Sequence, residues 1–337
     1  MKIGKIAIPI LLLALVAGLI VTDCQRNHSR KAAPHTILRG EALGTFYQIT
    51  ALGELPEGFQ SQLDSLFAEA NNSMSIFQSG SLLSRINRGE TSTADPHIAH
   101  CIALAQRVSE LSDGAYDITI RPLVEAFGFA GKDANYNINI DSLLDFVGYQ
   151  KVRLDGLEVV KSDPRVTIDL NSVAKGYTVD LAAQLVEATG CKDYLVDIGG
   201  EIYCRGTNPY GEAWGVGIET PFEGNFSLTG EHLTTIVRVS ECGMATSGNY
   251  RNFHTDPEGN KFTHIIDPRT LQPGRLWRAV CILCPDSGVA DALSTALYLL
   301  PVEEGQKLLD QFGAEAMWMG HDGENVYSDG FMGYVKN

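Results

Sequence analysis

The chain has 337 residues, 44% of them hydrophobic, which is enough for one large domain or two smaller ones with a substantial core. Its formal net charge of −15 leaves no basic surface that could displace the counterions of a nucleic acid, so a nucleic-acid partner is excluded. An anionic ligand would have to be held locally, by helix ends, a few cations or a bound metal.

The N-terminus is predicted to be a targeting signal. Lys2 and Lys5 flank the start of an apolar run, Ile6–Val21, and Cys24 follows this run. The pattern is typical of a bacterial lipoprotein that is cleaved before Cys24 and lipidated on its sulfur. An uncleaved signal anchor is the alternative, because Asp23 matches the usual small-residue cleavage site poorly.

Both alternatives place the rest of the chain outside the cytoplasm. We expect a signal peptide over residues 1–23, a polar tether over 24–35 and one domain over 36–337. The mature protein would then be anchored by its lipid at the periplasmic face of a bacterial membrane, with the choice between inner and outer membrane left open.

Six further cysteines are scattered over the domain: Cys101, Cys191, Cys204, Cys242, Cys281 and Cys284. The last two form a CxxC pattern, but they lie in an apolar run that predicts a strand. A redox pair is expected at a helix N-terminus, where the thiolate is stabilised. We therefore predict mainly buried thiols, leave a structural disulfide open, and exclude a zinc site because no second CxxC is present.

The first half of the domain reads as two strands followed by several helices. Apolar residues recur at helical spacing in Phe59, Leu63 and Phe67, which indicates a helix with one buried face. The expected elements are a strand–turn–strand over Thr36–Ala51, helices over Gly58–Asn72, Leu82–Asn87, Pro96–Leu111 and Asp141–Val147, and a hairpin of Val152–Leu154 with Leu157–Val160 across Asp155–Gly156.

A central junction follows. The alternating run Arg165–Leu170 predicts a strand, and Val173–Glu187 predicts an amphipathic helix with Asn171 or Ser172 as its N-cap. The start of such a helix presents free N–H groups and a partial positive charge, which suits a phosphate or another anion. An ordinary strand–helix junction is the alternative.

The second half of the chain is rich in strands. Tyr194–Ile198 predicts a strand that runs into the glycine pair at 199–200, where the backbone can approach a ligand closely. Strands are also expected over Trp214–Glu219, Thr235–Val239, Phe262–Ile266, Ala279–Cys284, Ala316–Met319 and Asn325–Tyr327, with helices over Val289–Leu300 and Val302–Phe312. Runs of strands with irregularly placed helices predict a single large α+β domain whose sheet is mixed but largely antiparallel.

Nine short stretches, taken together and in order, resemble the ApbE-type FAD:protein FMN transferases. They are Leu43–Tyr47, Met74–Phe77, Leu83–Asn87, Gly114–Asp117, Asp169–Tyr177, Ile198–Glu201, Ala245–Tyr250, His264–Arg269 and Ala290–Ala296. Each stretch alone is a weak signal, but their shared order over about residues 40 to 300 is highly specific.

The resemblance implies a reaction. Members of this family split the pyrophosphate of FAD, attach FMN to a Ser or Thr hydroxyl of a target protein and release AMP, with Mg²⁺ as the required cation. Such chemistry depends on charge neutralisation and alignment, which hard oxygen ligands and a divalent cation supply. The implied target is an electron-transfer subunit of the Na⁺-pumping quinone reductase or Rnf type.

The resemblance also implies the residues of the site. Positions that contact FAD are Leu43, Phe77, Ala115, Tyr116, Asp117, Asp169, Lys175 and Ile266. Metal-binding positions are Ser172, through its carbonyl oxygen, Asp291 and Thr295. Some members have a second Asp at the position of Ser294, so the number of metal ions stays open. We propose His264 as the base that accepts the proton of the target hydroxyl.

Several of these assignments have a purely structural alternative. Phe77 and Tyr116 would otherwise be core aromatics, Asp291 a favourable carboxylate in the first turn of a helix, and His264 a half-buried histidine in a strand. Leu271 also stands where the family usually has Gly, which predicts that the local turn differs, since a left-handed residue there would strain Leu.

Two other functions compete with the transferase. A Mg²⁺-dependent FAD pyrophosphatase would use the same fold and attack by water, giving FMN and AMP. A non-catalytic flavin-binding lipoprotein would need no metal, and the full set of metal positions argues against it.

Overall fold

The computed structural model describes residues 31–129, 140–222, 232–248, 253–255 and 261–335. The predicted signal peptide and Cys24 lie outside the described residues, so their assignment stays a prediction. Within the described ranges, none of the helices has the length and apolar character needed to span a membrane.

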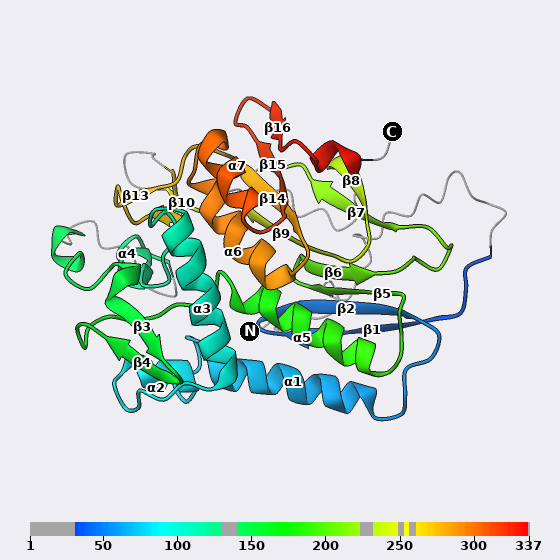
Figure 1. The fold of residues 1–337 in the computed structure, drawn as a ribbon, viewed down its shortest axis with the longest axis horizontal. Coiled ribbons are helices and arrows are strands. Elements are labelled where there is room, and N and C mark those ends of the chain that lie inside the picture. The colour runs from blue at the N-terminus through cyan, green and yellow to red at the C-terminus, as the bar shows by residue number, and fades with distance from the viewer. Residues whose placement is uncertain (1–30, 130–139, 223–231, 249–252, 256–260, 336–337) are drawn as a thin grey trace, which may run out of the picture.

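An eight-stranded sheet forms the centre of the domain (Figure 1). In spatial order its strands are β1 (His35–Ala42), β2 (Thr45–Leu52), β5 (Tyr194–Ile198), β6 (Glu201–Arg205), β9 (Cys242–Gly248), β14 (Ala279–Cys284), β15 (Glu315–Met319) and β16 (Asn325–Tyr327). Every neighbouring pair is antiparallel. The α+β prediction is confirmed, and this sheet is wholly antiparallel rather than mixed.

Two helices cover one face of the sheet. α5 (Ala174–Ala188) packs on β5 and β6, and α6 (Ser287–Tyr298) packs on β9 and β14. Further out, α1 (Phe59–Met74) contacts α5, and α3 (Pro96–Leu111) contacts α6 (Figure 1). Because α6 has neighbours on several sides, it is buried along nearly its whole length, which explains its apolar sequence.

The opposite face of the sheet carries a second core. A hairpin of β7 (Trp214–Glu219) and β8 (Leu233–Val239) packs its buried side chains against those of the central strands. The six described cysteines are free thiols, and five of them, including Cys281 and Cys284, are buried. The prediction of buried thiols is therefore confirmed.

The remaining elements are short. They are α2 (Leu82–Asn87), α4 (Arg121–Ala126), α7 (Val302–Asp310), the hairpins β3 (Val152–Asp155) with β4 (Glu158–Lys161), β10 (Phe253–Thr255) with β11 (Lys261–Thr263) and β12 (Ile266–Asp267) with β13 (Gln272–Pro273), and the 3₁₀ turns η2 (Ile140–Leu143), η3 (Tyr149–Lys151) and η4 (Phe331–Gly333). The helix expected over Asp141–Val147 is only the turn η2, and the strand expected over Phe262–Ile266 is broken between β11 and β12.

The strand predicted over Arg165–Leu170 is wrong. Val166, Ile168 and Leu170 are buried, which gives the alternating pattern, but the segment belongs to no sheet. A side chain takes the place of a neighbouring strand, since Asn87 donates to the carbonyl of Ile168 and accepts from its N–H, both at 2.8 Å. The alternating apolar residues therefore indicate that one side of the segment is buried, and not that the segment pairs with a neighbouring strand.

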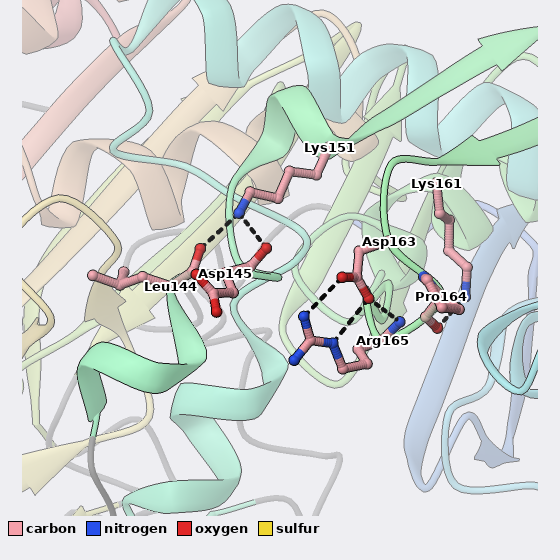
Figure 2. A network of polar contacts seen from close by, with 7 residues as sticks. All are labelled: Leu144, Asp145, Lys151, Lys161, Asp163, Pro164 and Arg165. Atoms are coloured by element: carbon pink, nitrogen blue, oxygen red, sulfur yellow. Dashed lines mark hydrogen bonds and ion pairs between the residues drawn. The ribbon is translucent and has the colours of Figure 1, made fainter.

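Polar contacts fix the chain just before this segment, as Figure 2 shows. The Arg165 guanidinium donates to both oxygens of Asp163, at 3.0 Å from Nε and 2.8 Å from Nη2. Lys161 donates to the carbonyl of Pro164 at 3.3 Å and to that of Asn87 at 3.2 Å. This loop is thereby tied to the end of α2, which brings Asn87 within reach of Ile168.

The helix after the segment starts later than predicted. The carbonyl of Leu170 accepts bonds from the N–H groups of Val173 and Ala174, so a turn precedes the helix. Val173 is the N-cap and makes no side-chain capping bond. The predicted N-cap at Asn171 or Ser172 is therefore wrong, and both residues lie in the turn that enters the site.

Candidate active site

The starts of α5 and α6 meet at a glycine. A Cβ atom on Gly176 would lie 2.3 Å from the carbonyl oxygen of Ser287 and 2.8 Å from the Cβ of Asp291, so only glycine fits. The N–H of Gly176 donates to Asp291 Oδ2 at 3.0 Å. A carboxylate of α6 thus accepts a bond from the first turn of α5, where the helix dipole favours a negative charge.

The reverse contact is made from α5. The Asp180 carboxylate accepts bonds from the N–H groups of Ser287 and Gly288, at 2.9 and 2.8 Å, in the first turn of α6. Each helix therefore caps the start of the other with a carboxylate. This reciprocal pair fixes the position of the Asp291 carboxylate before any ligand binds.

Asp180 gives the fold a specific pH dependence. Burial raises the pKa of Asp180 to about 7, above the value near 3.9 of an unfolded Asp. The protonated form is favoured in the folded state, so the stability from this group is full at low pH and falls as pH rises from about 4 to about 7. Asp180→Asn cannot ionise, so its Tm relative to the original chain should increase between about pH 5 and pH 8, as measured by differential scanning calorimetry.

The test is how the Tm difference between Asp180→Asn and the original chain changes with pH. Its absolute size is not informative, because asparagine accepts only one of the two N–H bonds and this loss shifts Tm by a constant amount. Asp193→Asn is the matched control, since Asp193 also accepts a backbone bond, from Thr207 at 2.7 Å. A Tm difference for Asp180→Asn that is flat with pH would contradict the raised pKa.

A half-buried ion pair lies next to this helix contact. Lys175, in the first turn of α5, forms an ion pair with Glu201, whose side chain is 7% exposed. Glu201 opens β6 after Gly199 and Gly200, both of which have positive φ angles. Glu201 lies in one of the stretches that resemble the family, but no role was predicted for it. A carboxylate directly after a glycine pair at the end of a strand could have indicated a site residue.

Negative charge exceeds positive charge around this ion pair. Burial alone would lower the pKa of Lys175, but the carboxylates of Glu201 and Asp291 outweigh it and raise the pKa. Burial, and then the charge of Glu201, raises the pKa of Asp291 to about 7. Burial likewise raises the pKa of nearby Asp197 to about 6. A site with several carboxylates and one ammonium favours an added cation.

The predicted metal positions fit Mg²⁺ by their chemistry. Asp291 and Thr295 are four residues apart on one face of α6. Ser172 lies in the turn before α5, and Tyr116 contacts its Oγ at 2.8 Å and its carbonyl at 3.5 Å. Asp291 Oδ1 accepts no hydrogen bond among the described residues, so this oxygen is available. Carboxylate, hydroxyl and carbonyl oxygens are the ligands that Mg²⁺ takes, together with water and substrate phosphate.

This donor set contains one carboxylate. Within the described ranges no three His, Cys, Asp or Glu side chains are grouped so that they could hold a metal ion. A cation here would therefore depend on neutral oxygens and on the phosphates of the substrate, in keeping with the way proteins bind Mg²⁺.

The two predicted aromatic contacts differ in their surroundings. Phe77 is 70% exposed, so the core interpretation is wrong for it and its ring is open to a ligand. Tyr116 is 1% exposed, so its ring is a core aromatic. Its hydroxyl nevertheless reaches Ser172, which makes Tyr116 a support for the turn that enters α5.

The other predicted FAD contacts lie on turns and segments around the helix pair. Leu43 has φ 52 in the turn between β1 and β2. Ala115 and Asp117 are buried, and burial raises the pKa of Asp117, whose Oδ1 accepts two bonds at 2.7 Å from Thr119. Asp169 accepts the N–H of Asn171 at 2.9 Å, and burial raises its pKa as well.

His264 and Ile266 flank Ile265, which packs in the same core cluster as Val173 and Ala290. His264 is exposed in the bend between β11 and β12, with its ring edge-on to Phe129 at 6.1 Å between centroids. The interpretation as a half-buried strand histidine is therefore wrong. Ile266 is buried in β12.

The turn after β12 keeps the conformation that glycine would favour. Leu271 has φ 60, so the prediction of a different local turn is wrong. Its N–H donates to the carbonyl of Asp267 at 2.8 Å, and its side chain packs against the buried cluster around α4. These contacts offset the roughly 1–2 kcal/mol that a left-handed conformation costs a non-glycine residue.

The chain is similar to known proteins over most of its length. A model of the ApbE family matches residues 43–318. A FAD:protein FMN transferase of Vibrio cholerae is 30% identical over 312 residues, covering 89% of this chain and 90% of that protein. One of Escherichia coli strain K12 is 29% identical over 335 residues, covering 92% of each.

Its fold is also similar to that of solved structures. The flavin transferase ApbE from Vibrio cholerae superposes with a TM-score of 0.78 at 28% identity, covering 90% of this chain and 99% of that one. The apo flavinyl transferase ApbE of Pseudomonas stutzeri gives a TM-score of 0.78 at 27% identity, with 90% and 98% coverage. The chain belongs to the ApbE family.

Proposed function

We propose that this chain is a FAD:protein FMN transferase that moves FMN from FAD to a Ser or Thr hydroxyl of a target protein and releases AMP. The observation that supports this most directly is the reciprocally capped helix pair, which presents an available oxygen of Asp291 beside the Lys175–Glu201 ion pair. Its relatives from Vibrio cholerae and Escherichia coli carry the same activity in their names.

Ser172, Asp291 and Thr295 would hold Mg²⁺, which when bound neutralises charge on the pyrophosphate. The positive end of the α5 helix dipole and the ammonium of Lys175 add positive charge for the phosphates. Glu201 holds that ammonium in place. Phosphoryl transfer is accelerated mainly by such positioning and charge stabilisation, and this is what the helix pair supplies.

The flavin or adenine would contact the ring of Phe77, which is open to solvent. Leu43, Ala115, Asp117, Asp169 and Ile266 complete the proposed FAD contacts. Tyr116 would act on this site through Ser172, because its ring is enclosed in the core.

We assign the general base to His264. Removing a general base typically costs about 10²- to 10⁴-fold in rate, so His264→Ala should slow FMN transfer by that factor. The measurement is the rate at which an acceptor domain gains the mass of FMN. His321→Ala is the control, because His321 is also exposed and contacts only the carbonyl of Arg275 among the described residues. Near-normal transfer by His264→Ala would remove the assignment.

We also propose that the protein is exported and anchored through a lipid on Cys24 at the periplasmic face of a bacterial membrane. Its acceptors would be electron-transfer subunits of the Na⁺-pumping quinone reductase or Rnf type. The apolar run before Cys24 and the lysines that flank it support this location.

One experiment separates the transferase from its alternatives. The full chain is incubated with FAD, Mg²⁺ and an acceptor domain that carries a Thr-containing motif, and protein mass and AMP are measured. A gain of one FMN per acceptor supports the transferase. Free FMN with AMP supports the pyrophosphatase, and neither product supports a flavin-binding lipoprotein.

A further inference from the structure

We propose that Ser247 is a positioning residue that turns the hydroxyl oxygen of Thr295 toward the cation. This inference rests on the proposed function, because Thr295 matters as a metal ligand only if the α5–α6 site binds one. Ser247 lies on β9, the strand that packs against α6, and no role was predicted for it from the sequence.

Two contacts between oxygen atoms link β9 to α6, and a third lies within α6. Ser294 Oγ lies 2.8 Å from the carbonyl oxygen of Asp291. Ser247 Oγ lies 2.8 Å from Ser294 Oγ and 3.3 Å from Thr295 Oγ1. The chain of contacts therefore runs from the backbone of one proposed metal ligand to the side chain of the other.

Only one arrangement of protons satisfies all three contacts. A carbonyl oxygen can only accept, so the single hydroxyl proton of Ser294 goes to Asp291. Ser294 must then accept from Ser247, which uses the single proton of that hydroxyl. Ser247 must in turn accept from Thr295. Any other assignment leaves two oxygens in contact with no proton between them.

This arrangement of protons fixes the orientation of the Thr295 hydroxyl. Its proton is directed to β9, which leaves the lone pairs of Oγ1 for a cation. A Thr hydroxyl in a helix otherwise tends to bond the carbonyl four residues earlier, which here is that of Asp291. Ser294 already donates to this carbonyl, so the contacts hold Thr295 away from that alternative. Residues that orient a metal ligand in this way affect metal affinity strongly.

The test measures cation binding directly. Mn²⁺ is titrated into the full chain, alone and with ADP as a diphosphate that has no flavin to transfer, and free Mn²⁺ is measured by electron paramagnetic resonance. Ser247→Ala is expected to weaken binding about 10- to 100-fold. Ser247→Thr keeps the hydroxyl and should bind Mn²⁺ as the original chain does.

Further variants separate orientation from a general loss of structure. Ser294→Ala frees the proton of Ser247 for Thr295, so it should weaken binding as well. Ser109→Ala, which removes another buried hydroxyl that donates to a helix carbonyl, at 2.8 Å in α3, should leave binding unchanged. In a Thr295→Val background, Ser247→Ala should cause no additional loss.

The outcomes also distinguish this inference from the proposed function. If Ser247→Ala binds Mn²⁺ as tightly as the original chain while Asp291→Ala does not, the role of Ser247 is overturned and the metal site stands. If Asp291→Ala binds Mn²⁺ normally, the metal site itself is overturned, and the role of Ser247 falls with it.

Discussion

Replacing Asp291 with asparagine should reduce Mg²⁺-dependent FMN transfer by about 10³-fold or more, because a metal ligand contributes several kcal/mol of charge stabilisation. The fold should survive the change. Asparagine has nearly the same shape, and its side-chain carbonyl oxygen can still accept the bond from Gly176, which Asp291 accepts at 3.0 Å. The variant therefore removes the charge and keeps the contact between the helices.

The stability of this variant should change in the opposite direction from its activity. Burial raises the pKa of Asp291 to about 7, so above that pH the metal-free protein must hold a poorly solvated charge. Without metal at about pH 8, Asp291→Asn should be at least as stable as the original chain. Added Mg²⁺ should raise the Tm of the original chain and leave that of the variant unchanged.

Transfer rates and melting curves with and without Mg²⁺ give both results from one set of samples. Asp193→Asn again serves as the control, because this carboxylate caps a turn away from the helix pair and should keep full activity. Substantial Mg²⁺-dependent transfer by Asp291→Asn would remove Asp291 from the metal site.

Elements with strong local signals were predictable from the sequence. α3 begins at a proline in its first turn and ends at a turn residue, and the prediction Pro96–Leu111 matches the structure at both ends. The buried strands Tyr194–Ile198 and Ala279–Cys284 also match, because continuous apolar runs bounded by turn residues leave little choice of limits.

Features that depend on distant partners were not predictable. The run before α5 alternates like a strand, but at Ile168 its hydrogen-bonding partner is the side chain of Asn87, 81 residues away. The capping of α6 by Asp180 spans 107 residues in the chain. Neither contact can be predicted from the pattern of neighbouring residues in the sequence. The N-cap was missed for the same reason, since the start of α5 is capped by α6 and not by its own turn.

The metal-binding role of Ser172, Asp291 and Thr295 was indicated by resemblance to the family and stays a prediction. The structure adds two features of their surroundings. One is the close approach of the helices at Gly176, and the other is the charge balance around Glu201. Both arise from contacts between residues far apart in sequence, which single-sequence patterns do not encode.

Gly176→Ala should therefore be among the most damaging small substitutions in the domain. In an ordinary helix this change stabilises by about 0.5–1 kcal/mol. Here the added Cβ would lie 2.3 Å from the backbone oxygen of Ser287, which cannot move aside as a flexible side chain could. The two helices must separate, and overpacking of this kind costs about 1–3 kcal/mol.

Separation would also undo the site, since it lengthens the bonds that Asp291 and Asp180 make to the opposite helix. We expect a lower Tm and a loss of Mg²⁺-dependent transfer that added Mg²⁺ only partly restores. Gly80→Ala is the control for stability, because a Cβ there meets no atom within 4 Å. An unchanged Tm with full transfer in Gly176→Ala would show that the helices do not need this close approach, and the reciprocal capping could then not be what positions Asp291.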